Sequence, residues 1–333
     1  MVGKFTKEEF TSQAEAWERV LKLEETFPDC EGNIIFFGAG VAYYAAKTLA
    51  WTVSDILKKP AFAVMSQDLT LNPSIIPSLD AGLFIAISRT GTVSDNIAAI
   101  KAIKSVNPNY KIYAVVGEVS DEIGRLCDYT ATLDIHEESV ATTKTISSII
   151  LAAQVMLSKY KAPDFYEALT KLPDLLRRLT PEYEKLSNEL AKKEFGQIIF
   201  TGTGAHYGIA EASALAVLEM SVERCFGYQS LVYLHGHCVT SNFYPTLVVA
   251  YISTNGQDIE VKALDTLNKE HTTLVCLGDL KNRIGNFSID MNTGIPDTAR
   301  SILYLPFAQL LGITRSINRG FNPDSPPNLK KVF

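Results

Sequence analysis

Short apolar runs alternate with longer amphipathic runs along most of this chain. Runs of about four to eight β-branched or aromatic residues predict buried strands, and longer runs with a period of about 3.6 residues predict helices. In the first half the pattern predicts strands at 33–37, 61–65, 83–88, 111–116 and 129–134, and helices at 41–57, 92–105 and 140–159. In the second half it predicts strands at 197–201, 225–229, 246–252, 273–277 and 301–304, and helices at 205–221, 257–269 and 305–318. Apolar strands alternating with helices indicate an α/β fold with doubly wound parallel sheets.

The same pattern of strand, turn and helix occurs twice. Residues 34–43 read IIFFGAGVAY and residues 198–207 read IIFTGTGAHY, with six identities in ten positions at an offset of 164 residues. LFIAISRTG then corresponds to LVVAYISTNG, and KIYAVVG to TTLVCLG, in the same order. A repeat this long indicates a duplicated domain rather than a solenoid unit. We expect an N-terminal helix with a first domain at 1–164, a helical linker at 165–195 broken by prolines, and a second domain with a turn-rich tail at 196–333.

Composition places the chain among ordinary folded proteins. Its 333 residues are 47% hydrophobic and 20% charged, which suits two domains of roughly 150 residues. A net charge of −6 disfavours nucleic acid as a partner, because nucleic acid selects a basic face. No apolar run approaches the ~20 residues of a membrane span, and the polar start does not resemble a signal peptide. Five scattered cysteines without a C-x-x-C pair favour reduced thiols, and we expect a cytoplasmic protein.

Two glycine turns and two hydroxyl-rich segments are candidates for ligand binding. Glycines in the turns 38–40 and 202–204 let backbone N–H groups approach an anion at a helix start, although a tight turn without a ligand is equally compatible. Tyrosines stand where a dinucleotide fingerprint needs its third glycine, so no NAD site is expected. In the segment SRTGTVS, hydroxyls of Ser88, Thr90 and Ser94 can bind a phosphate, with Arg89 adding charge; a helix cap is the alternative. The segment ESVATTK at 138–144 is either a cap or a ligand loop.

Two residues of the second half are candidates for proton transfer. Glu219 lies within the apolar run ALAVLEMSV, on a solvated stripe or partly desolvated, and desolvation would favour a general base. His235 follows the run LVYL, which we interpret as strand-like, and is compatible with a general acid or base. No third ligand has suitable spacing for a metal, so we expect neither a metal nor a cofactor.

Taken together, these motifs resemble the sugar isomerase (SIS) domain family in its tandem form, with two flavodoxin-like three-layer domains. The resemblance covers nearly the whole chain. Residues 211–236 and 308–326 resemble the tagatose/galactosamine-6-phosphate ketose–aldose isomerase or deaminase group. ESVATTK resembles the isomerase domain of glucosamine-6-phosphate synthase.

The resemblance implies a hexose or hexosamine 6-phosphate substrate and a division of roles. It implies that Gly40, Ser88, Arg89, Thr90 and Ser94 hold the phosphate, and that Val140, Ala141 and Thr142 line the sugar. It assigns ring opening to His235, proton transfer between C1 and C2 to Glu219, and a substrate contact to Lys331. It also implies a homodimer in which His235 comes from the neighbouring subunit.

Several positions depart from the family pattern and bear on the choice of substrate. They are Val41, Ala42, Val93, Ala216 and His237. One alternative function is a fructosamine-6-phosphate deglycase, which shares the same loops. The other is a non-catalytic sugar-phosphate sensor, which would not need both Glu219 and His235.

Overall fold

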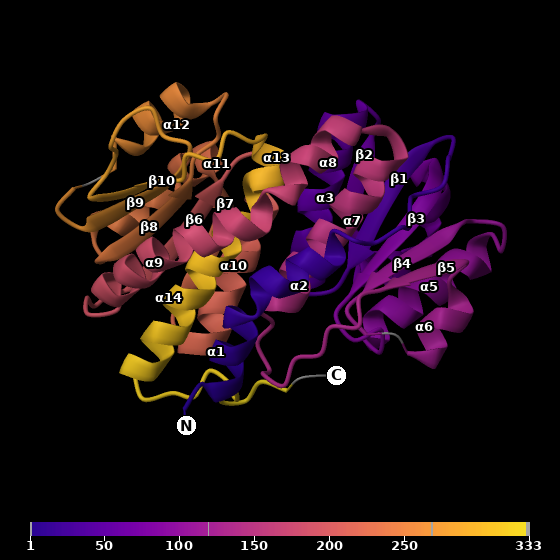
Figure 1. Cartoon of the computed structure of the whole chain (residues 1–333), viewed down its shortest axis with the longest axis horizontal. Helices are drawn as coiled ribbons and strands as arrows, with labels where there is room; N and C mark the ends of the chain where they lie inside the picture. Colours follow the sequence, from indigo (N-terminus) through magenta and orange to yellow (C-terminus); the bar gives the residue numbers. More distant parts are fainter. Residues whose placement is uncertain (1, 119, 268, 331–333) are drawn as a thin grey trace. The chain divides into compact units, whose positions relative to one another are not determined.

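The computed structural model describes residues 2–118, 120–267 and 269–330, and the chain divides into two compact units. The first unit contains residues 12–137, 142–173 and Lys330. The second unit contains residues 2–11, 138–141 and 174–329. Each unit is built on its own five-stranded parallel sheet (Figure 1).

The first unit is a three-layer α/β/α arrangement. Its strands, in the spatial order β2-β1-β3-β4-β5, are β1 (Asn33–Gly38), β2 (Ala61–Met65), β3 (Ala81–Ser88), β4 (Ile112–Val116) and β5 (Tyr129–Thr132). Its helices are α2 (Gln13–Val20), α3 (Val41–Leu57), α4 (Ser66–Leu71), the 3₁₀ helix η1 (Pro73–Leu79), α5 (Ser94–Val106), α6 (Asp121–Leu126), α7 (Lys144–Lys161) and α8 (Pro163–Thr170). Helices α3 and α7 lie on one face of the sheet, and α5 and α6 on the other (Figure 1).

The central strands of this sheet are buried on both faces. Residues 83–87 of β3 have no exposed surface, and β3 lies between β1 and β4. Burying a large aliphatic or aromatic side chain contributes about 1.5–3 kcal/mol, so the strand core holds the loops at its ends in place. This burial explains why these strands read as continuous apolar runs in the sequence.

The second unit has the same strand order in its own sheet. Its strands, in the order β7-β6-β8-β9-β10, are β6 (Gln197–Gly202), β7 (Cys225–Gln229), β8 (Thr246–Tyr251), β9 (Thr272–Gly278) and β10 (Phe287–Asp290). Its helices are α1 (Lys4–Thr11), most of α9 (Leu172–Leu190), α10 (Ala205–Ser221), α11 (Ser230–Leu234), η2 (His237–Asn242), α12 (Gln257–Leu264), α13 (Asp297–Arg300), η3 (Ser301–Leu303) and α14 (Tyr304–Asn318). Helices α10 and α14 pack side by side on this sheet (Figure 1).

The predicted strand at 301–304 is wrong. These residues form η3 and the first residue of α14, and the fifth strand is β10, which the sequence pattern missed. All four residues of SILY are buried. A short, fully apolar run does not distinguish a strand from a buried helix, because both bury every side chain.

The predicted helical linker contains α8 and α9. Pro173 lies in the first turn of α9, where a backbone N–H would have no partner within the helix, and Pro181 lies inside that helix. Residues 321–330 form turns and irregular structure, as the tail composition predicted. Within the described residues, no helix combines the length and apolar character needed to cross a membrane.

Candidate active site

Two turns lie next to each other at the carboxyl edge of the first sheet, since β1 and β3 are hydrogen-bonded neighbours. The chain continues from β1 to β2 on one side and from β3 to β4 on the other. Ligands of open α/β sheets bind where the strand order reverses in this way. Gly40, in the turn after β1, has φ 56°, and no atom lies within 4 Å of the position of an added Cβ. The turn therefore leaves open space at the start of α3.

The loop between β3 and α5 contains one internal hydroxyl and several accessible ones. Ser88 is buried, and its Oγ accepts a hydrogen bond from the N–H of Gly91 at 3.0 Å, so it fastens the turn. The Oγ1 atoms of Thr90 and Thr92 are 2.8 Å apart. Thr90 is half-buried, and Thr92 and Ser94 are exposed at the start of α5. The hydroxyl pair of Thr90 and Thr92 is thus the accessible polar feature of this loop.

Arg89 is held by a buried carboxylate. Its Nε lies 3.1 Å from Oε2 of Glu137, whose side chain has no exposed surface. The same carboxylate accepts hydrogen bonds from the Thr142 hydroxyl at 2.9 Å, from the Thr143 N–H and hydroxyl at 2.9 Å each, and from the Thr145 N–H at 3.0 Å. Glu137 therefore accepts hydrogen bonds from N–H groups at the start of α7 and joins the loop after β3 to that helix.

The charge on Glu137 is maintained by these contacts. Burial alone would raise the pKa of the Glu137 carboxyl, but Arg89 and the N–H groups at the start of α7 hold that pKa below its ordinary value. The predicted segment began at Glu138. The acceptor for the N–H groups at the start of α7 is the residue before it, Glu137.

The loop at 138–141 is fixed by two acidic residues that are distant in sequence. Oε1 of Glu9 accepts hydrogen bonds from the N–H groups of Glu138 at 2.5 Å and Ser139 at 3.0 Å, and the Ser139 hydroxyl donates to Oε2. The N–H of Val140 donates to the carbonyl oxygen of Asp324 at 3.1 Å. Helix α1 and the tail thus position the loop that carries the predicted sugar contacts.

The three predicted sugar contacts differ in exposure. Val140 is half-buried, whereas Ala141 and Thr142 are buried, and the Thr142 hydroxyl is bonded to Glu137. Of the three, Val140 is the side chain with the larger accessible part. The predicted substrate contact Lys331 lies outside the described residues.

Glu219 lies in the last turn of α10 in the second unit. It is half-buried, next to the buried Met220 and the exposed Leu218. The helix ends directly afterwards, because Val222 adopts a left-handed conformation with φ 56°. The carboxylate therefore stands near the C-terminal end of α10 and is reachable from solvent.

His235 is exposed at the end of a helix rather than a strand. The run LVYL, interpreted as strand-like, belongs to α11, which the Gln229 side chain caps by accepting hydrogen bonds from two of its N–H groups. Gly236 follows with φ 126°, a conformation that L side chains rarely adopt. The next residue, His237, stacks on Tyr228 with ring centroids 4.3 Å apart. This turn holds His235 at the edge of a cavity of about 390 Å³ that Tyr228 and His237 also line.

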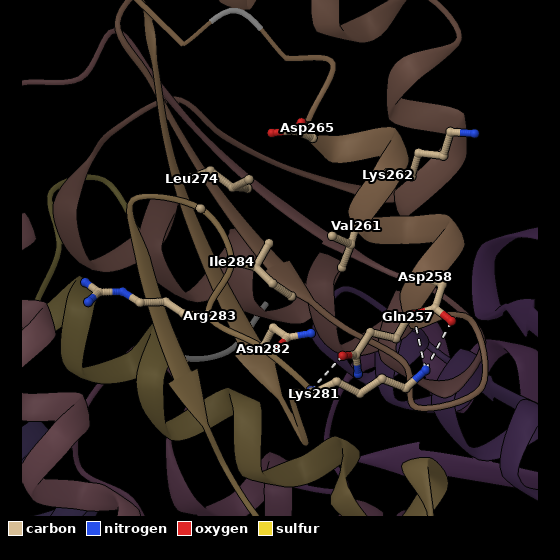
Figure 2. Close-up of a pocket in the computed structure, with 11 residues that line it drawn as sticks. Gln257, Asp258, Val261, Lys262, Asp265, Leu274, Lys281, Asn282, Arg283 and Ile284 are labelled. Carbon is tan, nitrogen blue, oxygen red and sulfur yellow. Dashed lines mark hydrogen bonds and ion pairs between the residues drawn. The ribbon is translucent and has the colours of Figure 1, made fainter.

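Another cavity, of about 410 Å³, lies between α12 and residues 281–285 (Figure 2). The Lys281 ammonium pairs with Asp258, and the Lys281 N–H donates to Oε1 of Gln257 at 2.8 Å. The Gln257 amide in turn donates to the carbonyl oxygen of Asp279. None of the predicted site residues is among its lining residues, so we assign it no part in the candidate site.

Three of the five cysteine thiols are poor nucleophiles because burial raises their pKa. All five are free thiols. Burial raises the pKa of the Cys276 thiol to about 12, and that of the Cys127 thiol to about 12, so both are protonated at neutral pH. Burial likewise raises the pKa of Cys225.

Sequence reasoning missed three residues that shape the loops. Thr92 stands within the segment already singled out, and its signal is a hydroxyl at a helix start. Glu137 directly precedes a hydroxyl-rich helix start, and that position could have indicated its capping role. Glu9 has no local signal, because it is 130 residues away from Ser139 in the chain.

Comparison with known proteins identifies part of this architecture. Residues 29–159, which contain the first sheet and both of its candidate loops, match the family model described as the SIS domain. This part of the chain is therefore similar to a SIS domain. Glutamine–fructose-6-phosphate aminotransferase [isomerizing] of Methanothermobacter thermautotrophicus is 24% identical over 324 residues, which cover 95% of this chain and 53% of that protein. The chain thus spans about half the length of the curated relatives it matches.

Solved structures share the fold over almost the full chain. Glucosamine-6-phosphate deaminase from Thermotoga maritima superimposes with a TM-score of 0.78 at 24% identity, covering 99% of both chains. Tagatose-6-phosphate ketose/aldose isomerase from Escherichia coli superimposes with a TM-score of 0.80 at 20% identity, covering 98% of this chain and 97% of that one. Identities this low establish a common fold of two α/β units.

Proposed function

We propose that this protein is a phosphosugar isomerase or deaminase acting on a hexose or hexosamine 6-phosphate. The observation that carries the proposal is the hydroxyl pair of Thr90 and Thr92 at the start of α5, within the SIS domain and at the reversal point of its sheet. Phosphate oxygens are strong acceptors for hydroxyls and for the free N–H groups of a helix start. The names of the three similar proteins described above each contain a hexose or hexosamine 6-phosphate, which supports this substrate class.

In the proposed mechanism the phosphate anchors the substrate and the second unit moves protons. His235 transfers a proton from the anomeric hydroxyl to the ring oxygen as the ring C–O bond breaks. The Glu219 carboxylate then removes the C2 proton of the open-chain aldose, giving a cis-enediol, and returns a proton to C1 to give the ketose. Phosphate binding remote from C1 and C2 provides the energy that orients the reacting carbons.

The same proton transfer also accounts for a deaminase. With an amine on C2, removal of the C2 proton gives an enolamine, and protonation at C1 gives an imine at C2. Water adds to this imine and ammonia leaves, so that hexosamine 6-phosphate and water yield ketose 6-phosphate and ammonia. An ammonia assay on the reaction mixture distinguishes deamination from isomerisation.

We also propose that the active form is a homodimer in which His235 reaches the site of the neighbouring subunit. His235 is exposed, and the second unit carries Phe226, Val232 and Val239 on the same segment with exposed fractions of 43%, 49% and 55%. Exposed apolar side chains gathered on one segment are typical of protein–protein contact surfaces. A second copy of the chain is the partner that this surface and the resemblance both favour.

The binding claim is tested by removing the two hydroxyls. We expect the double substitution Thr90→Ala, Thr92→Ala to weaken glucosamine 6-phosphate binding at least tenfold, since a hydrogen bond to a charged group contributes about 1.5–3 kcal/mol. Isothermal calorimetry measures the effect. Ser105→Ala is the matched control, because that residue is exposed on α5 and its hydroxyl donates to the Lys101 carbonyl oxygen of the same helix. Equal affinity in the double variant and in the wild type contradicts the proposed phosphate loop.

A further inference from the structure

The loop after β8 occupies the place in the second sheet that the phosphate loop occupies in the first. Strand β8 lies between β6 and β9, as β3 lies between β1 and β4. The loop reads STNG against SRTG, and α12 follows it as α5 follows the other. The hydrogen-bond donors of Ser253 and Thr254 in this second loop nevertheless bind carboxylates of the protein itself.

The first of these donors bind a buried glutamate. The N–H and the hydroxyl of Ser253 both donate to Oε2 of Glu260, at 2.8 and 2.9 Å. Glu260 lies one turn into α12 and is buried. In the first loop, by contrast, the corresponding Ser88 hydroxyl accepts from the N–H of Gly91.

The next donors converge on one aspartate. The N–H of Thr254 donates to Oδ2 of Asp297 at 2.9 Å, and its hydroxyl donates to Oδ1 at 2.7 Å. Nη2 of Arg300 donates to the same Oδ1 and, at 2.9 Å, to the Thr254 hydroxyl oxygen. Backbone N–H, hydroxyl and guanidinium together are the donor set with which proteins bind an oxyanion.

Arg300 is a buried part of this hydrogen-bonded cluster. Its side chain has no exposed surface, and its Nη1 lies 2.9 Å from Oδ2 of Asp279. Its Nε donates to the Tyr304 hydroxyl at 3.1 Å. The Asp297 side chain, in contrast, keeps 24% of its surface exposed, so solvent ions can reach the position of its carboxylate.

We propose that Thr254 and Arg300 form an oxyanion-binding site whose occupant is the protein's own Asp297 carboxylate. This site, which we call the Thr254–Arg300 site, is defined by the Thr254 N–H, the Thr254 hydroxyl and the Arg300 guanidinium. Asp297 fills this site in the native chain. The site becomes open to a small oxyanion when the Asp297 carboxylate is removed. The inference depends only on contacts within the second unit, so it holds whether or not the first loop binds a phosphate.

Chemical rescue of stability tests this site. Asp297→Ala deletes the carboxylate, and formate or inorganic phosphate supplies an oxyanion in its place. We expect either anion to raise the Tm of full-length Asp297→Ala by several degrees more than that of the wild type, compared with chloride at matched ionic strength. Asp258→Ala is the matched control, because it removes an exposed carboxylate paired with Lys281 in the same unit. Asp297→Asn is the blocked control, since its amide still fills the position.

The outcomes separate a specific site from a general salt effect. Stabilisation of Asp297→Ala alone supports the proposal. Equal shifts in the wild type, Asp258→Ala and Asp297→Ala overturn it, because phosphate stabilises folded proteins generally by exclusion from their surface. If Asp297→Ala does not accumulate in folded form, Asp297→Ser is compared in the same way, and the absence of selective stabilisation there also overturns the proposal.

Discussion

At Glu137, one carboxylate joins the two predicted ligand segments of the first unit. It pairs with Arg89 on the loop after β3 and accepts four hydrogen bonds from residues at the start of α7. A charge buried this completely is stabilising only while all of its partners are present. Glu137 therefore positions both loops, although no prediction assigns it a contact with substrate.

We expect Glu137→Gln to lower the free energy of unfolding at pH 7 by about 3–5 kcal/mol, because Arg89 then lacks its charged partner. Urea denaturation measures the loss. Glu138→Gln is the control, since that side chain is exposed, and we expect it to change stability by less than about 0.5 kcal/mol.

The pH dependence of this difference has a definite sign. The pKa of Glu137 is lowered in the folded state, so its stabilisation is fully present above the unfolded pKa of about 4.3 and is lost as the pH falls through the folded value. The difference between the wild type and Glu137→Gln should therefore narrow in acid. If the stability difference between the wild type and Glu137→Gln stays constant as the pH falls below about 4.3, the charge of Glu137 does not have the proposed role.

Residue-level prediction from the sequence succeeded where chemistry was local. The segment SRTGTVS was expected between a strand and a helix that starts near Val93, and it joins β3 to α5, which starts at Ser94. The prediction failed where a contact joins distant segments, as between Glu9 and Ser139, because neither segment contains a local pattern that indicates the other as its partner. The structural role of the buried Ser88 was also not evident. A serine that stabilises a turn and a serine that binds a ligand cannot be distinguished in the sequence.

At the scale of elements, the left-handed residue that ends α10 lowers the stability of the protein by an amount that can be measured. Val222 ends this helix with φ 56°, and its side chain is 48% exposed. A left-handed conformation costs an L-residue about 1–2 kcal/mol, and glycine adopts it freely. We expect Val222→Gly to raise the free energy of unfolding by about 1 kcal/mol in urea denaturation.

Val222→Ala is the matched control for this prediction. It removes the exposed methyl groups but keeps Cβ, so the conformational cost largely remains and its gain should be smaller. A Val222→Gly variant no more stable than Val222→Ala would contradict the role assigned to backbone conformation at this helix end.

The elements themselves were predictable where the pattern was long and periodic. The predicted helices at 41–57 and 205–221 are confirmed as α3 and α10 at those bounds. Short apolar runs were ambiguous: SILY and LVYL were interpreted as strands, and both lie in helical segments. All four side chains of SILY are buried, whereas in LVYL only Tyr233 is buried, and a window of four residues does not show this tertiary context.

At the scale of the whole molecule, the two units differ in what their equivalent loops do. The loop after β3 presents the Thr90 and Thr92 hydroxyls, whereas the loop after β8 directs its donors to Asp297 and Glu260. The candidate proton-transfer residues Glu219 and His235 both belong to the second unit. The proposed division of labour is phosphate binding by the first unit and proton transfer by the second.

Proton exchange at the substrate carbons tests this division most directly. The wild type and Glu219→Gln are incubated in D₂O with glucosamine, galactosamine, fructose, tagatose and fructoselysine 6-phosphates, and deuterium at C1 and C2 is followed by NMR. We predict exchange by the wild type with at least one of these compounds, and a loss of at least 100-fold, the order of a general base's contribution, in Glu219→Gln with binding retained. Near-wild-type exchange by Glu219→Gln, or binding without any exchange by the wild type, would contradict the proposed enzyme.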